Sequence, residues 1–126
     1  MNKLNKFIGL IKEGYRIKDK CILGIYVVNS AIFKLFGFKK NPLLLSAVTI
    51  KNDDGIFYCG KYIDASWTAS SFYENEILNN LRINEGVAID VGANIGKITV
   101  ILGKKLNGKG KVIAIEPSIE NFKILK

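Results

Sequence analysis

The sequence contains no histidine and only two cysteines among its 126 residues. Without histidine, the chain cannot supply an imidazole general base or a histidine metal ligand. Cys21 and Cys59 are too few and too far apart for a metal framework, so no metal site is predicted. We expect both cysteines to be ordinary core thiols in a reducing compartment, and we expect the protein to be cytoplasmic.

Positive charge is concentrated in the first third of the chain. Residues 1–40 carry nine lysines or arginines against Glu13 and Asp19, a net charge of +7. Residues 41–126 carry ten basic and nine acidic residues, a net charge of +1. The basic character therefore belongs to the N-terminal segment rather than to the rest of the protein.

Apolar residues recur at helical spacing through this basic segment, which predicts two helices. The first should end near Gly14, and the second should follow the apolar stretch from Cys21 to Phe38. Two interpretations remain open. The segment is either a helical cap that packs on the protein, or residues 1–40 make peripheral contact with an anionic surface such as the inner membrane surface. Nucleic acid is not expected, because no recognised binding motif accompanies the charges.

The middle of the chain predicts a hairpin followed by a helix. Asn41-Pro42 marks a break, and residues 52–55, Asn-Asp-Asp-Gly, form a turn between two strand-forming stretches. Ser71 and Glu74 then have the spacing of a capping box, which predicts a helix beginning at this point. Trp67 is expected to pack against that helix.

The most informative pattern lies between residues 87 and 116. Residues 87–91 predict a short buried strand, residues 97–105 a helix and residues 111–115 a second strand. Gly92 and Gly96 allow a tight turn and a close approach of a ligand to the backbone. This order predicts a βαβ unit whose helix N-terminus points at a binding crevice.

Two acidic residues indicate the class of ligand. Asp90, two residues before Gly92, would repel a dinucleotide's diphosphate but suits a ligand with a positive end. Glu116 follows 24 positions after Gly92, near the spacing at which a carboxylate accepts hydrogen bonds from a ribose. The glycines are too close for a phosphate loop, and Ile98 replaces that loop's magnesium-binding hydroxyl. We therefore favour S-adenosylmethionine, which has no phosphate, over a dinucleotide and over a turn without a ligand.

The motif at residues 90–96, Asp-Val-Gly-Ala-Asn-Ile-Gly, continues with Ile-Thr at 98–99 and Ala-Ile-Glu-Pro at 114–117. It resembles the start of an FkbM-type S-adenosylmethionine-dependent methyltransferase. The resemblance implies a Rossmann-like class I α/β fold and methyl transfer, typically to a hydroxyl of a sugar or another natural product. The resemblance also implies a site for the donor. The methionine end would be bound by Asp90, Gly92, Asn94 and Gly96. The ribose would be bound by Glu116, and the adenine edge would lie near Ser118. Ser118 departs from the family pattern, in which Asn is more frequent.

A fold of this type contains further strands, so we expect the chain to be a truncated N-terminal portion of the enzyme that is inactive by itself. Three regions are predicted: a basic helical segment (1–42), a hairpin and helix leading into the core (43–83), and the start of the donor-binding domain (84–126). No catalytic residue is predicted, because a base would lie with the small-molecule or glycan acceptor. The alternative is a non-catalytic interaction or membrane-surface module with a vestigial nucleoside-binding fold.

Overall fold

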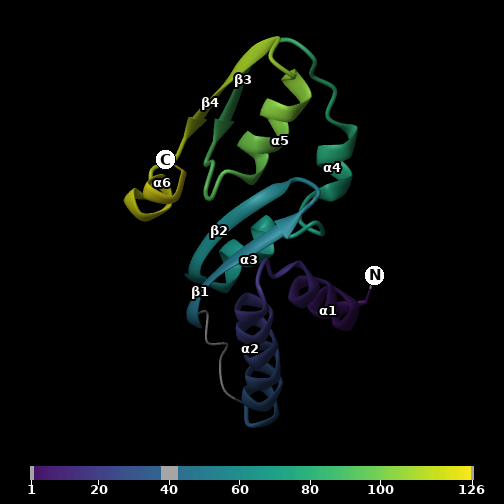
Figure 1. Cartoon of the computed structure of the whole chain (residues 1–126), viewed down its shortest axis with the longest axis vertical. Coiled ribbons are helices and arrows are strands. Elements are labelled where there is room, and N and C mark those ends of the chain that lie inside the picture. Colours follow the sequence, from purple (N-terminus) through teal and green to yellow (C-terminus); the bar gives the residue numbers. More distant parts are fainter. Residues whose placement is uncertain (1, 38–42, 126) are drawn as a thin grey trace.

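The computed structural model describes residues 2–37 and 43–125, which form a mixed α/β protein containing two small two-stranded sheets (Figure 1). Phe38 and the predicted break at residues 41 and 42 lie outside these ranges. None of the helices in the described ranges is long and apolar enough to cross a membrane. In chain order the elements are α1 (Lys3–Glu13), α2 (Ile17–Leu35), β1 (Leu43–Asn52), β2 (Gly55–Tyr62), α3 (Ile63–Ala69), α4 (Asn75–Asn80), β3 (Gly86–Val91), α5 (Lys97–Leu106), β4 (Gly110–Ile115) and α6 (Ile119–Leu125).

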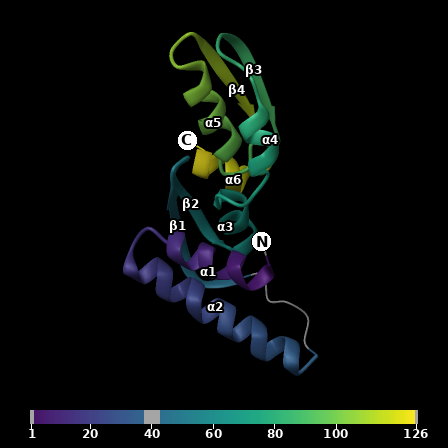
Figure 2. The same ribbon diagram turned by 90° about the vertical axis from the view of Figure 1, so that its right-hand side faces the viewer.

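The two predicted N-terminal helices are present as α1 and α2 (Figure 2). Gly14 ends α1, as predicted, and its N–H donates to the carbonyl of Ile11 at 3.2 Å. Near the start of α2, the buried carboxylate of Asp19 accepts the backbone N–H of Arg16 at 2.9 Å and that of Thr49 in β1 at 3.2 Å. The second bond fixes the beginning of α2 against the hairpin.

The predicted hairpin is confirmed. β1 and β2 pair antiparallel with Asn52 opposite Gly55, so Asp53 and Asp54 form the turn. The N–H of Asp54 donates to Oδ1 of Asn52 at 3.1 Å, a side-chain contact that favours a turn. The hairpin packs against α1, α2 and α3. The buried residues of this larger core are Leu10, Ile22, Leu23, Tyr26, Val48, Ile50, Phe57, Cys59, Ile63, Ala65, Ala69 and Ile95.

The predicted helix start at Ser71 is wrong. β2 runs directly into α3, and α4 begins only after Glu74, whose φ of 49° lies in the left-handed region. Ser71 caps no helix here, because its N–H and its hydroxyl both donate to the carboxylate of Glu13 in α1. Trp67 lies in α3, and its ring meets that of Phe7 in α1 edge-on, with the centroids 5.3 Å apart. Both segments are therefore fixed by α1 rather than by a local helix.

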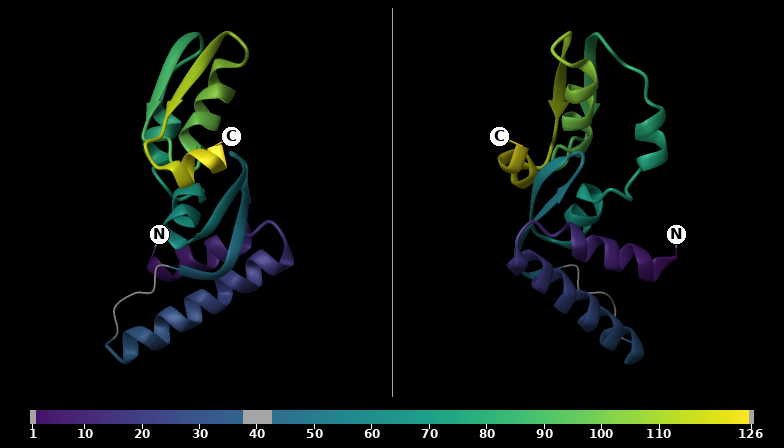
Figure 3. Two further views of the ribbon diagram at one scale, coloured as in Figure 1. Left: turned by 90° about the vertical axis from the view of Figure 1, so that its left-hand side faces the viewer. Right: turned by 45° about the vertical axis from the view of Figure 1, so that its right-hand side comes forward.

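The predicted βαβ unit is confirmed. β3 and β4 are parallel neighbours with Val91 opposite Ile115, and α5 connects them and packs on the pair. The left view of Figure 3 shows α5 beside the two strands. Ala88 of β3 forms a second, smaller core with Leu102 and Leu106 of α5. The strand, helix and strand that the apolar periodicity predicted are therefore present, and the two strands are parallel.

The apolar sequence of residues 87–91 predicted a buried strand, but β3 is exposed on one face. Val87, Ile89 and Val91 are 55%, 61% and 76% exposed, and their neighbours Ile113 and Ile115 in β4 are also exposed. Successive residues of a strand point to opposite faces of the sheet. α5 covers the face that carries Ala88, and the other face of this pair is open in the described structure.

The two cysteines differ in their surroundings. Cys59 of β2 is fully buried, as expected, and burial raises the pKa of its thiol to about 12. Cys21 is exposed, so the expectation of a core thiol is wrong for this residue. The reason is its position on α2, on the side opposite the buried residues Leu23 and Tyr26.

Candidate functional site

The candidate site lies at the carboxyl edge of the β3–β4 pair. Because Val91 and Ile115 are opposite each other, the loop after β3 and the residue after β4 begin at the same edge. The N–H groups of Gly92 and Ala93 both donate to the carbonyl of Ile115, at 2.8 and 3.0 Å. The loop is therefore bound to the end of the neighbouring strand where it leaves β3.

Positive φ angles explain the glycine spacing of this loop. The φ angles are 83° at Gly92, 53° at Asn94 and 88° at Gly96. Glycine adopts the left-handed region without a steric cost, and asparagine tolerates it better than most residues. A Cβ built at Gly92 would meet no atom within 4 Å, so space is open beside the backbone there. Gly96 directly precedes α5 as its N-cap residue.

Glu116 reaches the loop from the end of β4. One carboxylate oxygen accepts the N–H of Asn94 at 2.6 Å, and the other accepts the N–H of Ser118 at 2.9 Å. These backbone hydrogen bonds, first that from Ser118 and then that from Asn94, lower the pKa of Glu116 below its ordinary value. The carboxylate of Glu116 therefore lies against the glycine loop, at the same edge of the two strands.

Asp90 lies at the base of the loop and is 6% exposed. Its Oδ2 accepts a hydrogen bond from the hydroxyl of Thr99 at 2.5 Å. Thr99 was not among the predicted site residues. A hydroxyl in the first turn of the helix, after an acid at the end of the strand, is the signal that could have identified it.

Ser118 has a structural role at the start of α6. Its Oγ accepts the N–H of Asn121 at 3.3 Å and its carbonyl accepts the N–H of Phe122 at 2.8 Å. A serine that precedes a helix commonly satisfies free N–H groups in this way. Together with its own N–H bond to Glu116, Ser118 links the start of α6 to the site.

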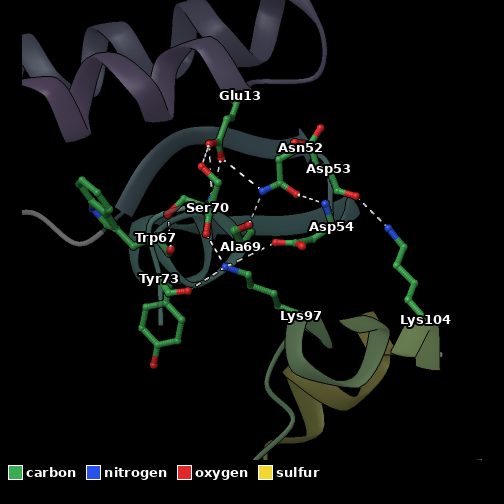
Figure 4. A network of polar contacts seen from close by, with 11 residues as sticks. Glu13, Asn52, Asp53, Asp54, Trp67, Ala69, Ser70, Tyr73, Lys97 and Lys104 are labelled. Carbon is green, nitrogen blue, oxygen red and sulfur yellow. Dashed lines mark hydrogen bonds and ion pairs between the residues drawn. The ribbon is translucent and has the colours of Figure 1, made fainter. Parts of the chain in front are cut away.

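Lys97 is a second residue near the loop that was not among the predicted site residues. It is the first residue of α5 and only 1% exposed, and its ammonium donates to the carbonyls of Ser70 and Tyr73 (Figure 4). The carboxylate of Asp54 in the hairpin turn lies 3.9 Å away. Burial lowers the pKa of Lys97 below its ordinary value, and the charge of Asp54 opposes that shift. The helix that follows the glycine loop is thus fastened to the preceding segments.

A second group of polar contacts supports this connection (Figure 4). The carboxylate of Glu13 accepts from Ser71 and, at 3.4 Å, from the amide of Asn52, which also donates to the carbonyl of Ala69 at 2.8 Å. On the exposed surface, Lys104 of α5 donates to the carbonyl of Asp53 at 2.9 Å. α1, the hairpin turn and the segment after α3 are therefore joined by hydrogen bonds.

The backbone of the loop offers few donors to an anionic ligand. The N–H groups of Gly92, Ala93 and Asn94 are used as described, and that of Gly96 donates to the carbonyl of Ala93 at 2.8 Å. Two carboxylates, Asp90 and Glu116, lie beside the same loop. Such a site suits a ligand with hydroxyl groups and positive charge. Within the described ranges, no group of three or more acidic or cysteine side chains is arranged to hold a metal ion.

Comparison of the chain with protein-family models, with curated proteins and with solved structures finds no match. The assignment of a function therefore depends on the chemistry of the loop, of Asp90 and of Glu116.

Proposed function

We propose that this chain forms the donor-binding part of an S-adenosylmethionine-dependent methyltransferase of the FkbM type. The position of Glu116 is the observation that supports this proposal most strongly, because its carboxylate lies against the glycine loop through the N–H of Asn94. In this proposal β3, α5 and β4 are the first βαβ unit of a Rossmann-like sheet. The motif at residues 90–96 supports the same family.

The hydrogen bonds of the loop favour S-adenosylmethionine over a dinucleotide. A pyrophosphate site needs backbone N–H groups that point at the ligand. Here four N–H groups of the loop are already bonded within the protein. The carboxylates of Asp90 and Glu116 would also repel a diphosphate, whereas they attract the sulfonium and ammonium groups of the methyl donor.

Each site residue has a definite role in this proposal. Each oxygen of Glu116 accepts one backbone N–H and keeps a further lone pair, so the carboxylate can accept the two ribose hydroxyls. Asp90, oriented by Thr99, provides negative charge at the methionine end. The backbone at Gly92 leaves room for the ligand beside it. Ser118 is proposed to lie near the adenine edge.

When bound, the donor supplies an activated methyl group for transfer to a nucleophile, here proposed to be a hydroxyl of a sugar or another natural product. The described residues contribute binding and orientation. Alignment of the nucleophile with the methyl carbon is the main requirement of such a transfer. None of the site residues is assigned as a general base.

Titration calorimetry with S-adenosylmethionine tests the proposal. Charge-assisted hydrogen bonds contribute about 1.5–3 kcal/mol each, so Glu116→Ala should weaken binding by at least about tenfold. Glu120→Ala, a change to an exposed carboxylate in α6, is the matched control and should leave the affinity unchanged. The proposal fails if the chain prefers NAD to S-adenosylmethionine, or if Glu116→Ala melts normally and binds the donor as tightly as the parent.

A further inference from the structure

α2 has an apolar face that no part of the described structure covers. Its buried residues pack on α1 and β1, and the opposite side carries exposed apolar residues. At about 3.6 residues per turn, their spacing places them in one stripe along the helix. The exposed residues of this stripe, which we call the α2 stripe, are Ile17, Ile25, Val28, Ile32 and Leu35.

The C-terminal half of α2 extends away from the rest of the protein. Figures 1 to 3 show its end projecting beyond the hairpin and α1 in every view. Every residue from 31 to 37 is exposed. The apolar side chains there are large, and Leu35 and Phe36 are 85% and 74% exposed. An exposed apolar surface of this kind is typical of a site of association.

The charges around the α2 stripe all have the same sign. The acidic residues in residues 2–37 are Glu13 and Asp19, and both carboxylates accept hydrogen bonds from within the protein. Two exposed lysines of α2 flank the stripe, with Lys18 on one side and Lys20 on the other. The face that α2 presents to its surroundings is therefore apolar in the centre and cationic at its margins.

We propose that the α2 stripe binds the surface of an anionic lipid membrane. The flanking lysines complement anionic headgroups, while the apolar residues enter the boundary between headgroups and acyl chains. The opposite face of α2 packs on the protein, so the helix lies along the membrane surface rather than through it. A second copy of the chain is a poorer partner, because two cationic margins would face each other.

Co-sedimentation of the full chain with lipid vesicles tests this proposal. We expect binding to vesicles of mixed phosphatidylcholine and phosphatidylglycerol, weaker binding at high salt, and little binding to phosphatidylcholine alone. Each lysine near an anionic surface raises binding by about fivefold. The double variant Lys18→Gln, Lys20→Gln should therefore lose at least about 10-fold. The double variant Ile25→Gln, Val28→Gln should lose about 10-fold or more.

Two control variants match these changes elsewhere on the surface. Lys109→Gln, Lys111→Gln removes two exposed lysines of the C-terminal part. Ile89→Gln, Ile113→Gln removes exposed apolar groups from the open face of β3 and β4. Both controls should retain binding within about threefold, and circular dichroism should show that all variants keep the fold.

Four results would overturn the proposal. One is equal binding to neutral and anionic vesicles, and another is a loss in either control as large as in the α2 variants. The third is found by sedimentation without lipid: a dimer that Ile25→Gln, Val28→Gln dissociates would show that the α2 stripe binds a second copy. The fourth is release of the chain from the vesicles by inorganic phosphate at an ionic strength at which chloride leaves it bound, which would assign the site to a free anion.

Discussion

Replacing the buried Lys97 by methionine should destabilise the fold, although methionine fills a similar volume. Lys97 donates to two main-chain carbonyls, those of Ser70 and Tyr73, at a position only 1% exposed. Hydrogen bonds from a charged donor contribute about 1.5–3 kcal/mol each. Removal of the donor deprives the carbonyl of Tyr73 of this bond, whereas the carbonyl of Ser70 keeps the N–H of Tyr73 at 3.2 Å. Burial of the ammonium costs free energy and offsets part of the hydrogen-bond contribution, in agreement with the lowered pKa of Lys97. We therefore expect the free energy of unfolding to fall by about 2–4 kcal/mol.

The pH dependence of this effect has a definite sign. Burial lowers the pKa of Lys97 in the folded chain, so the unfolded chain binds more protons between that value and the ordinary 10.5. The contribution of Lys97 to the free energy of unfolding therefore rises with pH through this window. The neutral amine keeps two N–H donors, which suffice for the two carbonyls. Lys97→Met should lack this rise.

Urea unfolding followed by circular dichroism measures both effects. Lys104→Met is the matched control, since the ammonium of Lys104 also donates to a main-chain carbonyl, that of Asp53 at 2.9 Å, but on the exposed surface. The control should change the free energy of unfolding by less than about 0.5 kcal/mol. If Lys97→Met and Lys104→Met unfold at the same urea concentration, the buried lysine does not stabilise the fold and the reasoning is wrong.

Two further predictions concern the glycine loop and the thiols. Gly92→Val and Gly108→Val should each cost about 1–2 kcal/mol of stability, because both glycines have positive φ angles, 83° and 79°, and open space beside them. Only Gly92→Val should weaken S-adenosylmethionine binding, and calorimetry showing equal affinities in the two variants would contradict the proposed role of the loop. For the thiols, Ellman's reagent should modify Cys21 rapidly in the native chain and Cys59 only after unfolding, since Cys59 is buried with a pKa of about 12. Cys21→Ser should then remove the fast phase, and its persistence would show that Cys59 is accessible.

The elements that the sequence predicted well depend on local signals. The turn at Asp53 and Asp54 follows from residue types that favour turns, and the βαβ unit follows from its periodicity and from Gly92 and Gly96. The position of Glu116 was predictable too, because parallel strands place their carboxyl ends at one edge. In each case a few adjacent residues determine the geometry.

The elements that were missed depend on distant partners. Ser71 has the local spacing of a capping residue, but Glu13, which lies 58 positions earlier, takes its hydrogen bonds. Lysine is rarely buried, and the partners of Lys97 are main-chain carbonyls, which have no signature in the sequence. α3 has no capping side chain, and its position depends on burial of Ile63 and Ala69 in the core. Only the packed structure can reveal such features.

The contacts of Glu116 have a consequence for testing the proposed site. The same carboxylate that would bind ribose also holds the N–H groups of Asn94 and Ser118. Glu116→Ala therefore removes a ligand contact and loosens the loop, so lost affinity could come from either effect. Glu116→Gln separates them at Asn94, because its carbonyl oxygen still accepts that N–H. Its NH2 group accepts neither the N–H of Ser118 nor the hydrogen of a ribose hydroxyl. If ribose binding is the main role, Glu116→Gln should lose most of the affinity lost by Glu116→Ala while the amide hydrogen of Asn94 stays protected from exchange. Full affinity in Glu116→Gln, with loss only in Glu116→Ala, would assign Glu116 to the architecture of the loop and leave the ribose without its proposed partner.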